Sequence, residues 1–223
     1  MTAMSQYPAS ILRSLLWIHE IFIYWVLEID PHNVNTLNIR GACLDSLSRY
    51  EESIHYYDRA LEINPRDILA LVNKGSSLGS LGRYEDAIRC FDKVLEIDPR
   101  DVDALLNKGN SLNSLGRYEE AIRYFDKALE IDPRNETVLN NKGISLASLG
   151  RYEESIRCFD KALKIDPNNV AAMYGKSIGL DNLGRNRDAA QSYRQFLALT
   201  PAPAQYAEEI ENARQRIKEL EGG

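Results

Sequence analysis

The sequence has few of the features that mark membrane spans or disulfide frameworks. Its 223 residues contain only three cysteines, Cys43, Cys90 and Cys158, with no CxxC pair among them. Three cysteines cannot all pair within one chain, which indicates reduced, buried thiols and a cytoplasmic protein. No apolar run reaches the roughly 18 residues that a membrane-spanning helix needs. The nearest approach, residues 15–27, is interrupted by His19 and Glu20.

Clustered basic residues are also missing. The chain has 27 Lys and Arg against 33 Asp and Glu, and its net charge is −6. Phosphate groups are recognised by massed Lys and Arg, whereas here the basic residues are spread evenly. Nucleic acid is therefore not an expected partner.

Residue patterns that carry catalysis are absent as well. The three histidines, His19, His32 and His55, lie near one end of the chain without ligand spacing, and metal sites need clustered donors. The sequence contains no GxSxG and no phosphate-binding glycine loop. We therefore expect no enzyme, no metal site and no cofactor.

What the sequence does contain is a long repeat. Six of the eight prolines fall at 31, 65, 99, 133, 167 and 201, each 34 residues from the last. Such a period is typical of repeat architectures. The second and third units share 25 of 34 residues without a gap. The predicted units are 34–67, 68–101, 102–135, 136–169 and 170–203, preceded by a divergent half repeat at 1–33 and followed by residues 204–223.

Each unit carries two apolar patterns at helical spacing. In the third unit they cover residues 104–115 and 121–131, with Gly116 between them. Glycine suits a left-handed helix end. Pro133 ends the second pattern, because proline disfavours helix at the residue before it. Strand-like alternation is absent from the sequence, so the predicted fold is all-α.

This pattern resembles the tetratricopeptide repeat family. The matching residues of the third unit are Gly109, Ala121, Phe125, Ala128 and Pro133, at positions 8, 20, 24, 27 and 32. The resemblance implies a right-handed α-solenoid of helix-turn-helix units that binds proteins or peptides. In such a unit the glycine and the alanine at position 20 let the two helices approach closely, and the phenylalanine fills the gap between units.

Position 7 departs from the family pattern, because it is basic where the family has an apolar residue. It holds Arg40 in the first unit and lysine in the other four. We expect this column to pair with the aspartates at position 25 and so to stabilise the stack. The lysines are Lys74, Lys108, Lys142 and Lys176, and the aspartates are Asp58, Asp92, Asp126 and Asp160.

The middle units differ most along one stripe of the first helix. Positions 2, 5, 9 and 12 change between the second and third units and again between the third and fourth. These spacings share one helix face, and a core must stay constant if units are to stack alike. In the tetratricopeptide repeat family this stripe lines the concave groove. With the asparagines at position 6, the predicted peptide-binding residues are Leu69, Val72, Asn73, Ser76, Asp103, Leu106, Asn107, Asn110, Asn113, Thr137, Asn140, Asn141 and Ile144.

The asparagines at position 6 have two interpretations. Asn73, Asn107 and Asn141 each offer a donor and an acceptor, which matches the backbone of an extended peptide. Alternatively, they only hydrogen-bond neighbouring helices. Positions 2 and 5 carry no lysine, so the clamp with which some family members grip a C-terminal carboxylate is not expected here.

The two ends of the chain differ from the units. Residues 204–221 place Tyr206, Ile210, Ala213, Ile217 and Leu220 on one side, which predicts a helix that caps the last unit. Residues 8–29 predict one helix that is apolar nearly all round, and a single neighbouring unit covers only one side of such a helix.

Self-association is our leading hypothesis for that N-terminal segment, giving a homodimer. Membrane-surface attachment and a folded-back cap are the alternatives. The sequence thus favours a protein-binding module, with a self-assembling scaffold as the second possibility. The residues expected to mediate self-association are Trp17, Ile18, Ile21, Phe22, Tyr24 and Trp25.

Overall fold

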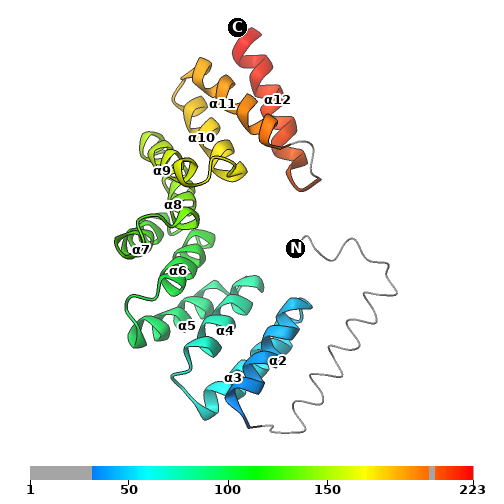
Figure 1. Ribbon diagram of the computed structural model, residues 1–223, viewed down its shortest axis with the longest axis vertical. Coiled ribbons are helices and arrows are strands. Elements are labelled where there is room, and N and C mark those ends of the chain that lie inside the picture. Colours follow the sequence, from blue (N-terminus) through cyan, green and yellow to red (C-terminus); the bar gives the residue numbers. More distant parts are fainter. Residues whose placement is uncertain (1–31, 201–203, 223) are drawn as a thin grey trace, which may run out of the picture. The chain divides into compact units, whose positions relative to one another are not determined.

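The structure is a computed structural model that describes residues 32–200 and 204–222. Every regular element in these two ranges is a helix (Figure 1). The residues form two compact units, one up to Pro99 and one from Arg100 onward. The predicted N-terminal helix at 8–29, with its self-association residues, lies outside the described part of the chain.

The first unit contains the first two repeats. Its helices are α2 (Val34–Ser46), α3 (Tyr50–Ile63), α4 (Ile68–Ser80) and α5 (Tyr84–Ile97). Each helix packs against the next one along the chain. The first helices of the two repeats, α2 and α4, also contact each other. Side chains at the same repeat position therefore lie side by side on these two helices.

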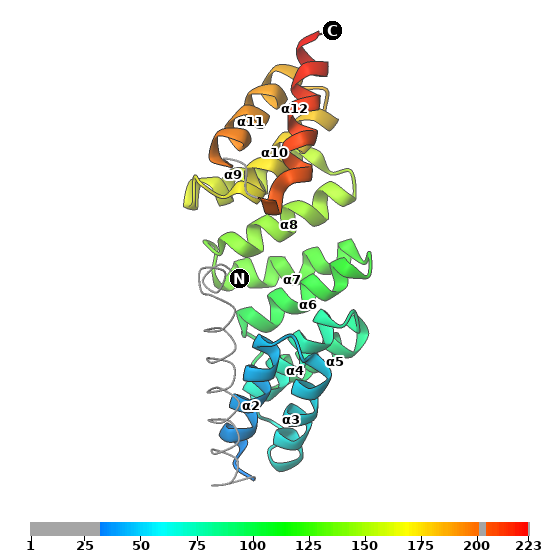
Figure 2. The same cartoon turned by 90° about the vertical axis from the view of Figure 1, so that its right-hand side faces the viewer.

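The second unit contains the other three repeats and the C-terminal helix. Its helices are α6 (Val102–Ser114), α7 (Tyr118–Ile131), α8 (Glu136–Ser148), α9 (Tyr152–Ile165), α10 (Val170–Asn182) and α11 (Asn186–Leu199), followed by the 3-10 turn η1 (Ala204–Tyr206) and α12 (Ala207–Gly222). Sequential helices pack together, and α8 also contacts both α6 and α10. In Figure 2, the first helices α6, α8 and α10 follow one another in order along the second unit.

Side-chain caps fix where the first helices begin. Asp67, Asp101, Asn135 and Asn169 each accept a hydrogen bond from the backbone N–H three residues further on. Such a bond satisfies one of the unpaired donors at a helix start. The second helices begin after an arginine without a side-chain cap, and they carry acidic residues in the first turn, where the positive end of the helix dipole favours negative charge.

A left-handed residue ends each first helix. Gly82, Gly116, Gly150 and Gly184 have φ between 68° and 74°, which confirms the prediction for Gly116. The first repeat has Ser48 at this place, with φ of 59°. A side chain makes the left-handed conformation unfavourable by roughly 1–2 kcal/mol, so the first repeat carries a strain that its neighbours lack.

The glycine at position 8 packs against an aromatic ring of its own repeat. A Cβ built on Gly109 would lie 2.4 Å from Cε1 of Phe125. The predicted close approach is therefore filled by the ring rather than by the second helix's backbone. The ring also serves the gap between repeats, as expected, because a Cβ on Gly175 of the fifth repeat would lie 2.5 Å from Cζ of Phe159 in the fourth.

Three of the predicted lysine–aspartate pairs are confirmed. The Lys74 and Lys176 ammonium groups lie 2.5 Å and 2.7 Å from carboxylate oxygens of Asp58 and Asp160, and Lys142 pairs with Asp126.

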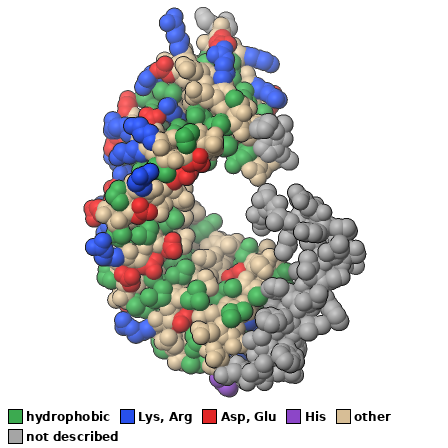
Figure 3. All heavy atoms as spheres, in the orientation of Figure 1, with side chains coloured by type: hydrophobic (Ala, Val, Ile, Leu, Met, Phe, Trp, Pro, Cys, Tyr) green, Lys and Arg blue, Asp and Glu red, His purple; other side chains and the backbone are tan. Residues whose placement is uncertain are grey.

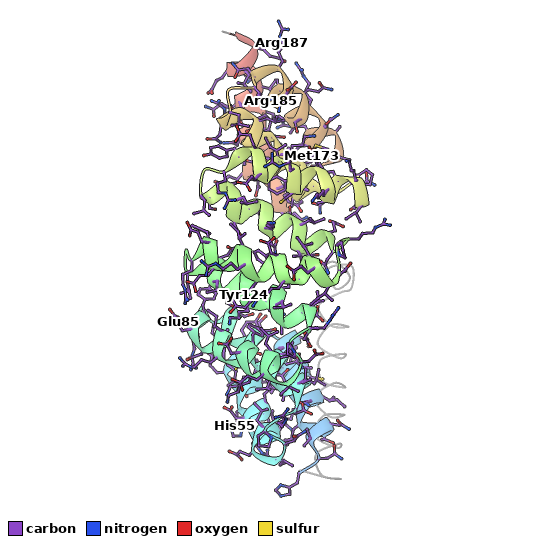
Figure 4. The ribbon with its side chains drawn as sticks, turned by 90° about the vertical axis from the view of Figure 1, so that its left-hand side faces the viewer. His55, Glu85, Tyr124, Met173, Arg185 and Arg187 are labelled. Carbon is purple, nitrogen blue, oxygen red and sulfur yellow. The ribbon has the colours of Figure 1, made fainter. Side chains whose placement is uncertain are left out.

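Lys108 contacts an aromatic ring of its own repeat. It donates a hydrogen bond of 2.7 Å to the hydroxyl of Tyr124, and its Nζ lies 4.1 Å from the centre of that ring. Tyr124 is labelled in Figure 4.

Charged side chains gather over α7 and α9 in Figure 3.

The cysteines behave largely as expected. Cys90 and Cys158 are buried and Cys43 is half-buried, and none of the three forms a disulfide. Burial raises the pKa of each thiol above its usual range. They are packing residues rather than reactive groups.

The C-terminal helix packs with its apolar side against the fifth repeat. Ile210 and Ala213 are buried in a cluster that includes Phe196. Arg216 donates two hydrogen bonds, of 2.7 Å and 2.8 Å, to the carboxylate of Asp181 on α10. Within the described ranges, none of the helices combines the length and the apolar composition that a membrane span requires.

Candidate functional site

The variable stripe lies on the surface of the first helices. Its residues in the first unit are on α4, and those in the second unit are on α6 and α8. None of the thirteen predicted groove residues is buried. Leu69 and Ile144 are large apolar side chains that are 55% and 47% exposed. The changeable positions are therefore outside the core, as the sequence predicted.

On α4, Asn73 stands beside a hydrogen-bonded network. The Tyr57 hydroxyl donates a bond of 2.7 Å to Asp45, and Ser77 donates another of 2.7 Å to the same carboxylate. Burial, aided by the Asp45 carboxylate, raises the pKa of Tyr57 above its usual range, and a hydrogen bond from Asn73 opposes this. Asp45 on α2 thus links α3 and α4, and Asn73 stands beside this link.

In the second unit, two hydrogen bonds join α8 to α6. The Asn141 amide donates a hydrogen bond of 2.7 Å to the Asn110 side-chain carbonyl. Ser145 donates one of 2.8 Å to the side-chain carbonyl of Asn113. For Asn141 the structure therefore favours the alternative interpretation, in which the amide bonds a neighbouring helix.

Among the described residues, the side chains of Asn107 and Asn140 form no such hydrogen bond to a neighbouring helix. Within the described ranges, the Asn107 amide forms no side-chain hydrogen bond. The Asn140 side-chain oxygen is buried and has no hydrogen-bond partner among the same residues. A buried acceptor without a partner costs roughly 1–3 kcal/mol.

The stripe carries little charge. Asp103 is the single ionisable residue among the thirteen. The stripe therefore offers apolar contact from Leu69 in the first unit, and from Leu106 and Ile144 together with amide hydrogen bonds in the second unit. It has no array of charges that would select a highly charged ligand. The described residues contain no group of three or more His, Cys, Asp or Glu that could hold a metal ion.

A pocket of about 410 Å³ continues the stripe at α8, α10 and α12. Of the thirteen predicted groove residues, only Ile144 lines it. The sequence comparison missed the part on α10, because it compared the nearly identical second, third and fourth units. The signal was present in the fifth unit, where positions 2, 5 and 9 are Ala171, Tyr174 and Ile178, and all three line the pocket.

Comparisons with known proteins agree with the repeat. A family model described as tetratricopeptide repeat matches residues 72–136, and another of the same description matches 34–67 and 137–169. No curated protein is significantly similar to the chain.

Several solved structures share the fold. MamA of Desulfovibrio magneticus RS-1 is 20% identical with a TM-score of 0.71, covering 75% of this chain and 95% of that one. YrrB, described as a TPR protein with an unusual peptide-binding site, is 19% identical with a TM-score of 0.68, covering 86% and 97%. TTC0263, a TPR protein of Thermus thermophilus, is 20% identical with a TM-score of 0.63, covering 84% and 98%. At such identities the likeness concerns the fold alone.

Proposed function

Because the chain belongs to the tetratricopeptide repeat family, we propose that it is a non-catalytic interaction module whose first helices bind a peptide or helix of another protein. The observation that carries the proposal is the exposed variable stripe. It presents apolar side chains such as Leu106 and Ile144 beside the amides of Asn107 and Asn140.

The stripe matches the chemistry of a peptide backbone. Asn107 offers a donor and an acceptor and Asn140 offers its amide donor, and a net hydrogen bond contributes about 0.5–1.5 kcal/mol. Leu106 and Ile144 offer apolar contact on the same helices. Peptide binding by YrrB, stated in that protein's description, is in keeping with such a use of this fold.

The test is selection of peptides from a displayed library on the full chain, followed by affinity measurement. The double substitution of Asn107→Ala and Asn140→Ala should weaken binding about tenfold or more, since two bonds are lost. Glu119→Ala, on an exposed position of α7, is the control and should bind normally. Failure to select any peptide, or equal binding by the double variant, would contradict the proposal.

Asn141→Ala is a poor test of binding by itself. It removes the bond to Asn110 and so changes the helix stack as well as the surface. Asn107 and Asn140 avoid this ambiguity because their side-chain amides do not bridge helices.

A second candidate is a self-assembling scaffold. Its support is the sequence of residues 8–29, which is apolar nearly all round and so needs a partner surface. We also place the protein in the cytoplasm, in keeping with three thiols that form no disulfide.

A further inference from the structure

We propose that the pocket between α8, α10 and α12 is an anchor site for one large apolar side chain of a bound peptide, with a lysine or arginine next to it. The inference rests on the proposed function and names the chemistry of the partner. It concerns the second unit alone.

The walls of the pocket are mostly apolar. Ile144, Ala147 and Ile178 form its aliphatic side, and Tyr152, Tyr174 and Tyr206 stand around it. Phe159 and Phe196 also line it, and because both are almost completely buried they form the floor. The volume of about 410 Å³ lies near the lower end of the range for ligand sites, about 300–1,000 Å³. One aromatic or long aliphatic side chain suits that space.

The rim of the pocket is acidic. Glu209 lines it, and no Lys, Arg or His does. Burial raises the pKa of Tyr174 above its usual range, and Glu209 and Glu208 add to this, so the field at the mouth is negative. Within the described ranges Glu209 forms no ion pair. Aromatic faces with a nearby carboxylate favour a cation and disfavour a phosphate or a C-terminal carboxylate.

The pocket lies where the amide column ends. Position 6, which is asparagine in the second, third and fourth repeats, is Gly175 in the fifth. An asparagine there would collide with Phe159, since even a Cβ would lie 2.5 Å from its ring. Ile144 belongs to both the stripe and the pocket, so a peptide held along α6 and α8 reaches the pocket directly.

The C-terminal helix is a required wall. Tyr206 and Glu209 come from η1 and α12, and the repeats themselves contain no equivalent of that segment. The pocket is therefore specific to this end of the second unit, and it fixes the register of a chain bound along α6 and α8.

The test uses the full chain, labelled with carbon-13 in its isoleucine methyl groups, and three short probes. They are acetyl-Trp-Lys-amide, acetyl-Trp-Glu-amide and acetyl-Ala-Lys-amide. We expect the first probe to shift the methyl signals of Ile144 and Ile178, with an affinity about fivefold above that of the second, the factor expected for one solvent-exposed charge pair. The third probe should cause almost no shift.

Two pairs of variants make the test specific. Glu209→Gln should abolish the preference for lysine over glutamate, whereas Glu208→Gln, one residue away and outside the lining, should keep most of it. Ala171→Trp should fill the pocket and remove binding. Asn35→Trp, at the same position of the first repeat, should bind normally.

Several results would overturn the inference. They are unchanged Ile144 and Ile178 signals, equal affinity for the lysine and glutamate probes, and shifts that appear on concentrating the protein alone, which would assign the pocket to a second copy of the chain. Peptides selected in the earlier experiment that bind Ala171→Trp normally would leave the proposed function intact and remove the pocket from it. Binding of the probes together with failure to select any peptide would keep the pocket as a binding site and contradict the proposed function.

Discussion

Gly79 and Gly109 lie in first helices of the same kind, yet their surroundings differ completely. A Cβ on Gly109 would collide with Phe125, whereas a Cβ on Gly79 would meet nothing within 4 Å. The family resemblance already implies a packing role for Gly109, and the structure shows that the ring of Phe125 is the group it packs against.

Gly109→Ala should therefore destabilise the protein by about 1–3 kcal/mol, because the ring must move. Gly79→Ala is the matched control and should stabilise it by about 0.5–1 kcal/mol through helix propensity. Chemical denaturation measures both free energies of unfolding. Equal effects of the two substitutions would contradict the packing described here.

Tyr57 gives a residue-level dependence on pH. Burial and Asp45 raise its pKa in the folded state above the ordinary value of about 10. The folded chain therefore keeps a proton that the unfolded chain releases, and the free energy of unfolding should fall as pH rises above about 10. Tyr57→Phe should show a smaller fall. Denaturation at a series of alkaline pH values measures the difference, and parallel curves would rule out the effect.

The amides show where residue-level prediction from sequence reaches its limit. That the stripe lies outside the core followed from its variability, and none of its residues is buried. The bond from Asn141 to Asn110 and the unpartnered oxygen of Asn140 did not follow. The same residue type takes different partners according to what stands opposite on the neighbouring helix, and the spacing within one helix does not specify that.

At the scale of elements, the first helices depend on their caps and the second helices do not. Asp101 accepts from the N–H of Ala104, whereas Arg117, which precedes α7, makes no side-chain cap. The 34-residue proline spacing located the helices of each repeat, because turn chemistry is local. The pocket depends on three elements meeting, and no single segment predicts it.

Asp101→Ala should cost about 0.5–2 kcal/mol of stability, since it leaves a helix-start donor unpaired. Asp101→Asn should cost much less, because asparagine already caps α8 and α10. Thermal melts of the two variants provide the comparison. Equal losses would show that the charge of Asp101, rather than its hydrogen bond, stabilises α6.

At the scale of the whole molecule, the N-terminal segment decides between a single module and an assembly. Removing residues 1–30 takes away the most apolar stretch of the sequence. If self-association depends on that stretch, light scattering should give a dimer for the full chain and a monomer for the shortened one. Monomeric masses for both would eliminate the scaffold hypothesis.

Ser48, in the turn after α2, has a consequence for how the array melts. In stacked repeats each unit is held mainly by its neighbours, so local differences decide where unfolding begins. Ser48 holds a left-handed backbone where four later turns have glycine. Heating should loosen the first repeat before the others, which hydrogen exchange can detect, and Ser48→Gly should delay this opening. This single substitution would thus move the site where unfolding begins away from the first repeat.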